Sequence, residues 1–292
     1  MPSSTLASGT ASAPAGWAGR RRVRRLQLLV PLAVVGGVAA LAAFAPLLTP
    51  YGAETIDPLL RMALPSPAHL LGTDEFGRDI LSRVAYGARI TLLVSVASIG
   101  LAVCVGTLLG SAAAFFGGAI DLLVMRIADG LLSFPPILLA IYVITFLGPS
   151  VVNVILVIAL LYIPRFARVA HAATLSVRET EYVQAAQAQG ARPARILRRA
   201  VLPNIAAPLF VQASLGLGHA ILLESGLSFL GLGAPPPAPS WGRMIEQSSR
   251  FMTLSVWPVV WPASIVSGTV LAFNLLGDAL RDWLDPRLRG SV

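Results

Sequence analysis

Long apolar runs separated by short polar segments make up most of this chain. Each run is long enough to form a helix across a bilayer, because a hydrocarbon core of about 30 Å needs about 20 mostly apolar residues. The runs do not alternate between apolar and polar positions, as the strands of a membrane barrel would. The pattern predicts an all-α membrane protein with six transmembrane helices, over residues 26–48, 89–116, 122–147, 151–167, 204–232 and 254–277.

Three features refine this pattern. Pro135-Pro136 falls inside the third run and should break or kink that helix, because proline lacks a backbone donor and clashes with the preceding turn. Residues 79–88 carry apolar side chains at helical spacing and predict a separate amphipathic helix on the outer surface. A proline-rich loop after the fifth run carries Trp241, which suits an anchor at the membrane interface.

The same pattern divides the chain into four parts. We expect a disordered basic cytoplasmic tail over residues 1–25, then the first transmembrane helix and an extracytoplasmic segment over 26–88. A core with five transmembrane helices follows over 89–281, and it contains a cytoplasmic loop at 168–203. A short cytoplasmic tail, 282–292, ends the chain.

Composition and charge agree with a membrane protein. Of the 292 residues, 55% are hydrophobic and 12% are charged, which excludes an ordinary soluble domain. All 22 basic residues are arginine and the net charge is +8; with the N-terminus inside, 16 arginines fall in inner segments and 6 in outer ones. Cytoplasmic segments carry the basic excess in membrane proteins, so both termini are predicted to be cytoplasmic. The partners of this charge are then anionic membrane lipids, and no nucleic acid is expected.

The cytoplasmic loop is the one long basic, helix-forming segment between the apolar runs. Residues 176–179 fit a capping box that can begin a helix. Gly190 suits the left-handed residue after that helix, and Pro193 suits the first turn of a second helix over 193–200. Such a helical hairpin is too small to fold alone, and the pattern predicts a surface on which a soluble partner docks.

The same loop resembles a known motif. It is similar to the cytoplasmic "EAA" loop of binding-protein-dependent ABC import permeases, in which E-A-A is followed by glycine and later by Leu-Pro. The matching residues here are Gln184, Ala185, Ala186, Gly190, Leu202 and Pro203. The acidic position holds Gln184, while Glu181 places a carboxylate one turn earlier. Which of these two side chains makes the polar contact to the ATPase is left open.

Further segments extend the resemblance over about residues 69–289. LGTDEFGRDILSRVAYGARI, SFPPILLA, PSWGRMI and NLLGDALRDWLDPRLR resemble the C-type permease of dipeptide, oligopeptide and nickel importers. The resemblance implies the fold of a type I ABC importer permease in a bacterial inner membrane. It also implies a second, different permease subunit, one or two ATPase subunits, an extracytoplasmic binding protein and a peptide substrate.

The absence of lysine bears on the ATP site. A Walker A loop needs a lysine on the phosphates, and this chain has none. The chain therefore cannot carry a standard ATP site, and ATP and Mg²⁺ would be used by the partner ATPases. We expect no catalytic residue, metal site or bound cofactor in this chain.

Polar side chains inside the apolar runs are candidates for the transport pathway. These residues are Tyr142, Asn153, Gln212, His219 and Glu224. An ionisable group in a bilayer is costly and should face the protein interior with a partner. Glu224 therefore also supports a second function from a different class, a proton-coupled secondary carrier.

The sequence is compatible with two more functions. One is an importer permease of the same family for nickel or another small solute, although His69, His171 and His219 fall in three separate segments. The other is an anchor or assembly subunit without a transport role.

Overall fold

The computed structural model describes residues 17–284, and side chains from residue 27 onward. Helices are the regular elements of this range, apart from one isolated bridge between Thr73 and Asp79. They are α1 (Trp17–Ala43), α2 (Ala45–Leu48), η1 (Pro58–Leu60), α3 (Ile80–Phe116), α4 (Gly118–Leu132), α5 (Pro136–Leu147), α6 (Val151–Arg178), α7 (Glu181–Ala188), α8 (Pro193–Ile196), η2 (Leu197–Val201), α9 (Leu202–Phe229), α10 (Trp241–Ser249) and α11 (Trp257–Leu284).

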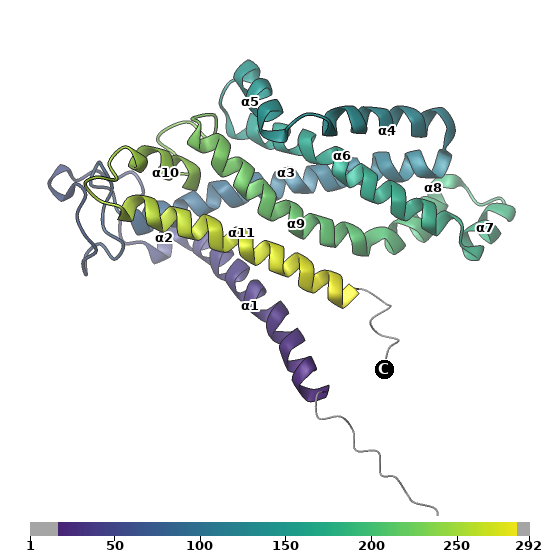
Figure 1. Cartoon of the computed structure of the whole chain (residues 1–292), viewed down its shortest axis with the longest axis horizontal. Coiled ribbons are helices and arrows are strands. Elements are labelled where there is room, and N and C mark those ends of the chain that lie inside the picture. Colours follow the sequence, from purple (N-terminus) through teal and green to yellow (C-terminus); the bar gives the residue numbers. More distant parts are fainter. Residues whose placement is uncertain (1–16, 285–292) are drawn as a thin grey trace, which may run out of the picture.

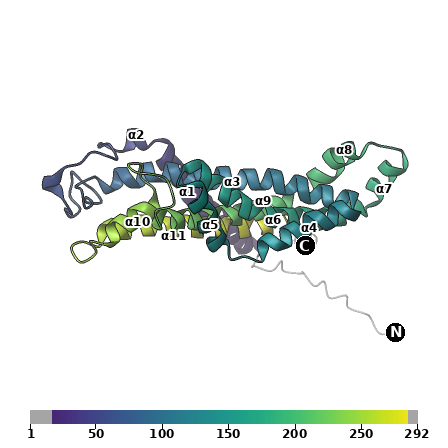
Figure 2. The same cartoon turned by 90° about the horizontal axis from the view of Figure 1, so that it is seen from above.

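The helices form an elongated, flat bundle (Figures 1 and 2). The segment between α2 and α3 gathers with α10 at one end, which we name the α10 end, and α7 and α8 project from the opposite α7 end (Figure 1). One cluster of buried apolar residues joins α3, α5, α6, α7 and α9, and a second joins α1, α3, α10 and α11. The two clusters together run from one end of the bundle to the other.

Four helices are long and apolar enough to cross a membrane. They are α3, α6, α11 and the continuous helix Pro193–Phe229, most of which is α9. The pair α4 and α5 adds a fifth span if it is counted as one bent crossing. The apolar part of α1, Gln27–Ala43, is shorter, so a sixth span remains a prediction.

Helix α3 packs most closely on α6, and two glycines explain the approach. Gly106 and Gly110 form a G-x-x-x-G pair, a spacing that lets two helix backbones meet. A Cβ atom at Gly110 would lie 2.1 Å from the carbonyl oxygen of Ala167 on α6, and one at Gly106 would lie 2.6 Å from the Cβ of Phe166. Side chains at these two positions would force the helices apart.

The predicted interruption at Pro135-Pro136 is confirmed as a full break. Helix α4 ends at Leu132, α5 begins at Pro136, and the two helices are bent by 93°. Figure 1 shows α4 lying along α6, while α5 turns away from the direction of α4.

Three predicted helix boundaries are wrong, because in each case a helix continues through the boundary. The amphipathic helix over 79–88 and the second span are one helix, α3, and Arg89 does not interrupt it. The capping box at residues 176–179 does not begin a helix, because α6 continues to Arg178. The second helix of the loop is likewise not separate, since α8 continues through η2 into α9.

The terminal helices also extend further than expected. Helix α1 begins at Trp17, within the segment 1–25 for which a disordered tail is predicted, and residues 1–16 lie outside the described range. Helix α11 continues to Leu284, and residues 285–292 of the predicted C-terminal tail lie outside that range.

Trp241 is not an interfacial anchor. Its side chain is fully buried, and its indole Nε1 donates to the carbonyl oxygen of Val84 at 3.0 Å. It begins α10, a helix that the proline-rich sequence does not predict. The backbone of α10 crosses α9 closely, because a Cβ at Gly242 would lie 2.0 Å from the carbonyl oxygen of Ser225.

A buried ionic network holds the α10 end together. Arg78 Nε donates to Asp74 Oδ2 at 2.7 Å, and Arg78 Nη2 donates to Glu75 Oε1 at 3.1 Å. Arg83 of α3 has a side chain only 2% exposed, and its Nε lies 3.3 Å from the same Asp74 oxygen. The hydroxyl of Ser248 in α10 donates to Glu75 Oε2 at 3.1 Å. The network therefore joins the segment before α3 to both α3 and α10.

Candidate functional site

The Glu181–Pro203 segment begins with a short helix whose end is set by a glycine. Gly190 has a φ of +74°, and its N–H donates to the carbonyl of Gln187 at 2.9 Å. The N–H of Ala191 donates to the carbonyl of Ala186 at 3.1 Å. These two bonds form a Schellman motif, which closes a helix at a left-handed residue. The predicted left-handed conformation of Gly190 is confirmed.

Helix α7 rests on the bundle through two apolar side chains. Val183 is fully buried in the larger apolar cluster, and Ala186 is half-buried against it. The other side chains of α7 are exposed: Glu181, Tyr182, Gln184, Ala185, Gln187 and Ala188. The helix thus presents almost its whole surface at the end of the molecule (Figure 2).

The two candidates for the polar contact of the motif differ in their surroundings. The Gln184 Nε2 donates to the carbonyl of Glu179 at 3.1 Å, so this amide caps the end of α6. The exposed Glu181 forms no hydrogen bond or ion pair with any residue that the structure describes. The carboxylate that is free to meet a partner is therefore one turn before the position that the motif gives to its acid.

The second half of the segment continues into the long helix α9 without a loop. Pro193 occupies the first turn of α8 as predicted, and Leu197–Val201 follow as a π-helical stretch that leads directly into α9. Ile196 and Val201 are buried in the larger cluster, whereas Pro203 is exposed and Leu202 is half-buried. A displacement of α8 therefore acts on α9 without an intervening loop.

Polar contacts tie the neighbouring helices together at the same end. Arg178 Nη1 donates to the carbonyl of Ala114, joining the ends of α6 and α3 at 3.0 Å. His171 Nε2 lies 2.8 Å from Asp121 Oδ1, which joins α6 to α4. Asp129 of α4 pairs with Arg168 of α6.

The five polar candidates inside the apolar runs do not form one site. Tyr142 is 72% exposed on α5, and the Asn153 amide caps the end of α5 by donating to the carbonyls of Leu147 and Gly148. On α9, Gln212 is half-buried, while His219 is exposed and its ring nitrogen meets the carbonyl of its own helix at Leu215. No hydrogen bond joins any two of these candidates within residues 27–284.

Glu224 is buried where α9 meets α3 and α10. It is 1% exposed, and it accepts a hydrogen bond from the Ser228 hydroxyl at 2.7 Å and a longer one from Ser225 at 3.4 Å. No arginine or histidine in the described range pairs with it. The hydroxyl of the buried Thr91 on α3 faces the same carboxyl group, so Glu224 is surrounded by hydroxyl groups of α9 and α3.

The residues that the structure describes contain no group of three or more His, Cys, Asp and Glu side chains placed to hold a metal ion.

Comparison with known proteins identifies the family of this chain. The family described as "Binding-protein-dependent transport system inner membrane component" matches residues 106–290. The chain belongs to this family. It is a multi-pass transport component of the inner membrane, and in this family ATP hydrolysis resides in separate subunits. The resemblance that the Glu181–Pro203 segment indicates is thus confirmed.

Curated relatives cover most of the chain. The dipeptide transport system permease protein DppC of Alkalihalophilus pseudofirmus is 44% identical over 261 residues, which are 89% of this chain and 86% of the relative. The glutathione transport system permease protein GsiD of Pectobacterium atrosepticum is 41% identical over 251 residues, covering 86% of this chain and 83% of the relative.

A solved structure supports the fold. A chain of the inward-facing MetNI methionine ABC transporter matches with a TM-score of 0.58 at 19% identity, over 70% of this chain and 96% of that chain. At this identity the likeness shows a shared ABC importer permease fold and carries no information about the substrate.

Proposed function

We propose that this chain is one of two different permease subunits of an ATP-driven importer of di- or oligopeptides. The two relatives described above are named for the transport of dipeptides and of glutathione, which supports a peptide substrate. Each permease supplies half of the pathway, an extracytoplasmic binding protein delivers the peptide, and one or two ATPase subunits drive transport.

The observation that carries this proposal is the construction of α7. An eight-residue helix that is held by Val183 and Ala186 and exposes its other side chains has no structural role that uses those side chains. A partner ATPase covers them, and Glu181 supplies the polar contact. Because α8 continues into α9, closure of the ATPases pulls on α9 directly.

The orientation follows from the charge distribution. The α7 end carries the loop arginines and lies in the cytoplasm, while the α10 end faces outward and receives the binding protein. With α1 as a sixth span and α4–α5 as one broken span, both termini are cytoplasmic. On the pathway side, the exposed Tyr142 of α5 lines the route of the peptide.

Copurification tests the proposal. The full chain, tagged at its C-terminus, is purified from detergent-solubilised membranes, and its partners are identified by mass spectrometry. We expect a second permease and at least one ATPase chain, with ATP hydrolysis in the eluate and ATP-dependent uptake of radiolabelled dipeptide after reconstitution.

The same preparation separates the importer from the carrier and peptide from nickel. A chain that purifies alone and takes up peptide along a proton gradient without ATP, but not as the variant Glu224→Gln, would establish the carrier instead. Uptake of Ni²⁺ but not of dipeptide would retain the importer and replace its substrate.

A further inference from the structure

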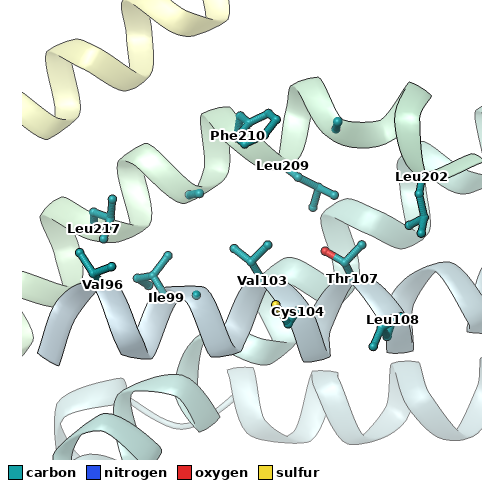
Figure 3. A pocket seen from close by; sticks show the side chains of 13 residues that line it. Val96, Ile99, Val103, Cys104, Thr107, Leu108, Leu202, Leu209, Phe210 and Leu217 are labelled. Carbon is teal, nitrogen blue, oxygen red and sulfur yellow. The ribbon is translucent and has the colours of Figure 1, made fainter. Parts of the chain in front are cut away.

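An apolar groove of about 630 Å³ runs between α3 and α9 and is open along one side. Figure 3 shows side chains of the two antiparallel helices facing each other across it. Val96 and Leu217 lie at the end toward α10, and Leu108 and Leu202 lie at the end toward α7 (Figure 3). The lining is apolar apart from the small polar groups of Cys104 and Thr107.

Small residues create this groove. Gly100, Ala206 and Ala213 line it, and a Cβ at Gly100 would meet nothing within 4 Å. From Val96 to Leu108 the groove follows α3 for about 18 Å at 1.5 Å per residue. That length is close to one leaflet of hydrocarbon, which is about 15 Å or half of a bilayer core.

The shape and lining of the groove suit a single acyl chain. A single acyl chain is slender enough to enter between the two helices and leaves no polar backbone group in an apolar lining.

Two arginines lie just beyond the α7 end of the groove. Arg198 precedes the groove residue Leu202 by four positions, about one turn of the π-helical stretch, so it lies near the same side of the helix, and Arg199 is its neighbour in the chain. Both are exposed, and neither forms a hydrogen bond or ion pair with a residue of the described range. Guanidinium groups bind phosphate oxygens with paired hydrogen bonds.

We propose that this groove binds one anionic phospholipid. Its acyl chain fills the space between α3 and α9, and its phosphate lies on Arg198 and Arg199. The site connects the lipid leaflet to the helix that carries the Glu181–Pro203 segment. It is independent of which substrate the chain transports.

Native mass spectrometry of the full chain, with whatever subunits copurify, tests the site. Membranes are exchanged into equal amounts of phosphatidylglycerol and phosphatidylcholine with identical acyl chains, and the lipid retained by the chain is identified. We expect one phosphatidylglycerol per chain. Arg198→Gln with Arg199→Gln should weaken its retention roughly thirtyfold, at about fivefold for each charge.

Matched variants separate the headgroup from the groove. Arg126→Gln with Arg281→Gln removes two exposed arginines elsewhere and should leave retention unchanged. Gly100→Phe fills the groove and should abolish retention, whereas Gly268→Phe, where a Cβ also meets nothing within 4 Å, should preserve it. Equal retention of the two lipids by the unmodified chain, or full retention by Gly100→Phe, would overturn the proposal.

The single cysteine, Cys104, allows a test on the unmodified sequence. Cys104 is exposed and lines the groove, so a maleimide-benzophenone attached there reports on its occupant after photolysis. A lipid adduct supports the proposal, and an adduct with another polypeptide shows that the groove is a subunit contact and contradicts it.

Discussion

Gly190 fixes the direction in which the chain leaves α7. Its φ of +74° lies in the left-handed region, and a Cβ there would meet nothing within 4 Å. The backbone conformation alone therefore requires glycine at this position, and no crowding contributes. A β-branched residue in this conformation costs on the order of 1–2 kcal/mol and would open the Schellman motif.

Replacing Gly190 with valine should uncouple transport from ATP hydrolysis, because α7 would lose its angle to α8. We expect the amount of dipeptide taken up per ATP hydrolysed to fall several-fold in proteoliposomes. Gly190→Asn is the control, since asparagine adopts the left-handed conformation more easily and should keep most of the coupling. A valine variant that assembles and transports with a normal ratio would remove this role from Gly190.

Asp129 and Trp241 show where reasoning from the sequence stops. Asp129 follows Arg126 by three positions on α4, a spacing that suits an ion pair on one helix face, yet it pairs with Arg168, 39 positions away. Trp241 has the amphipathic chemistry of an interfacial anchor, but its N–H partner, Val84, lies 157 positions earlier. Local spacing contains no information about contacts of this range.

At the scale of elements, the apolar runs predict the long helices well and their ends poorly. Charged residues such as Arg89 mark a change of environment, but they do not stop a helix, so α3 continues through the predicted boundary. Prolines and glycines at helix ends are better guides, as the break at Pro135-Pro136 and the turn at Gly190 show. Helix α10 escapes prediction because its amphipathic pattern follows directly on a run of prolines.

The ionic network at the α10 end ties three elements together and should dominate the stability of that end. Asp74→Asn keeps the shape of the side chain but leaves Arg78 and Arg83 buried with less negative charge. Breaking a buried ion pair in this way typically costs about 3–5 kcal/mol. We expect a lower thermal unfolding temperature and faster proteolysis between α2 and α3.

The exposed pair Glu246 and Arg250 provides the comparison. The Arg250 side chain is 74% exposed, so solvent screens the pair, and Glu246→Gln should cost about 1 kcal/mol or less. Equal losses for Asp74→Asn and Glu246→Gln would mean that the buried network adds nothing to the α10 end.

At the scale of the whole molecule, the two ends differ in chemistry in a way that predicts their sides of the membrane. At the α10 end, Arg78 and Arg83 are buried and paired with Asp74. At the α7 end, Arg198 and Arg199 are exposed and unpaired within the described range. Because an excess of arginine is typical of cytoplasmic segments, we expect the α7 end on the cytoplasmic side.

Cysteine labelling tests this orientation and the sixth span together. In a Cys104→Ala background, single cysteines replace Leu59, which is 94% exposed, Leu175 of α6, which is 40% exposed, or Ser3. With a membrane-impermeant maleimide on intact spheroplasts, Leu59→Cys should react at once, whereas Leu175→Cys and Ser3→Cys should react only after permeabilisation. Labelling of Ser3→Cys from outside would place the two ends of α1 on one side of the membrane. Helix α1 would then lie along the bundle without crossing the bilayer, which its shorter apolar stretch would explain.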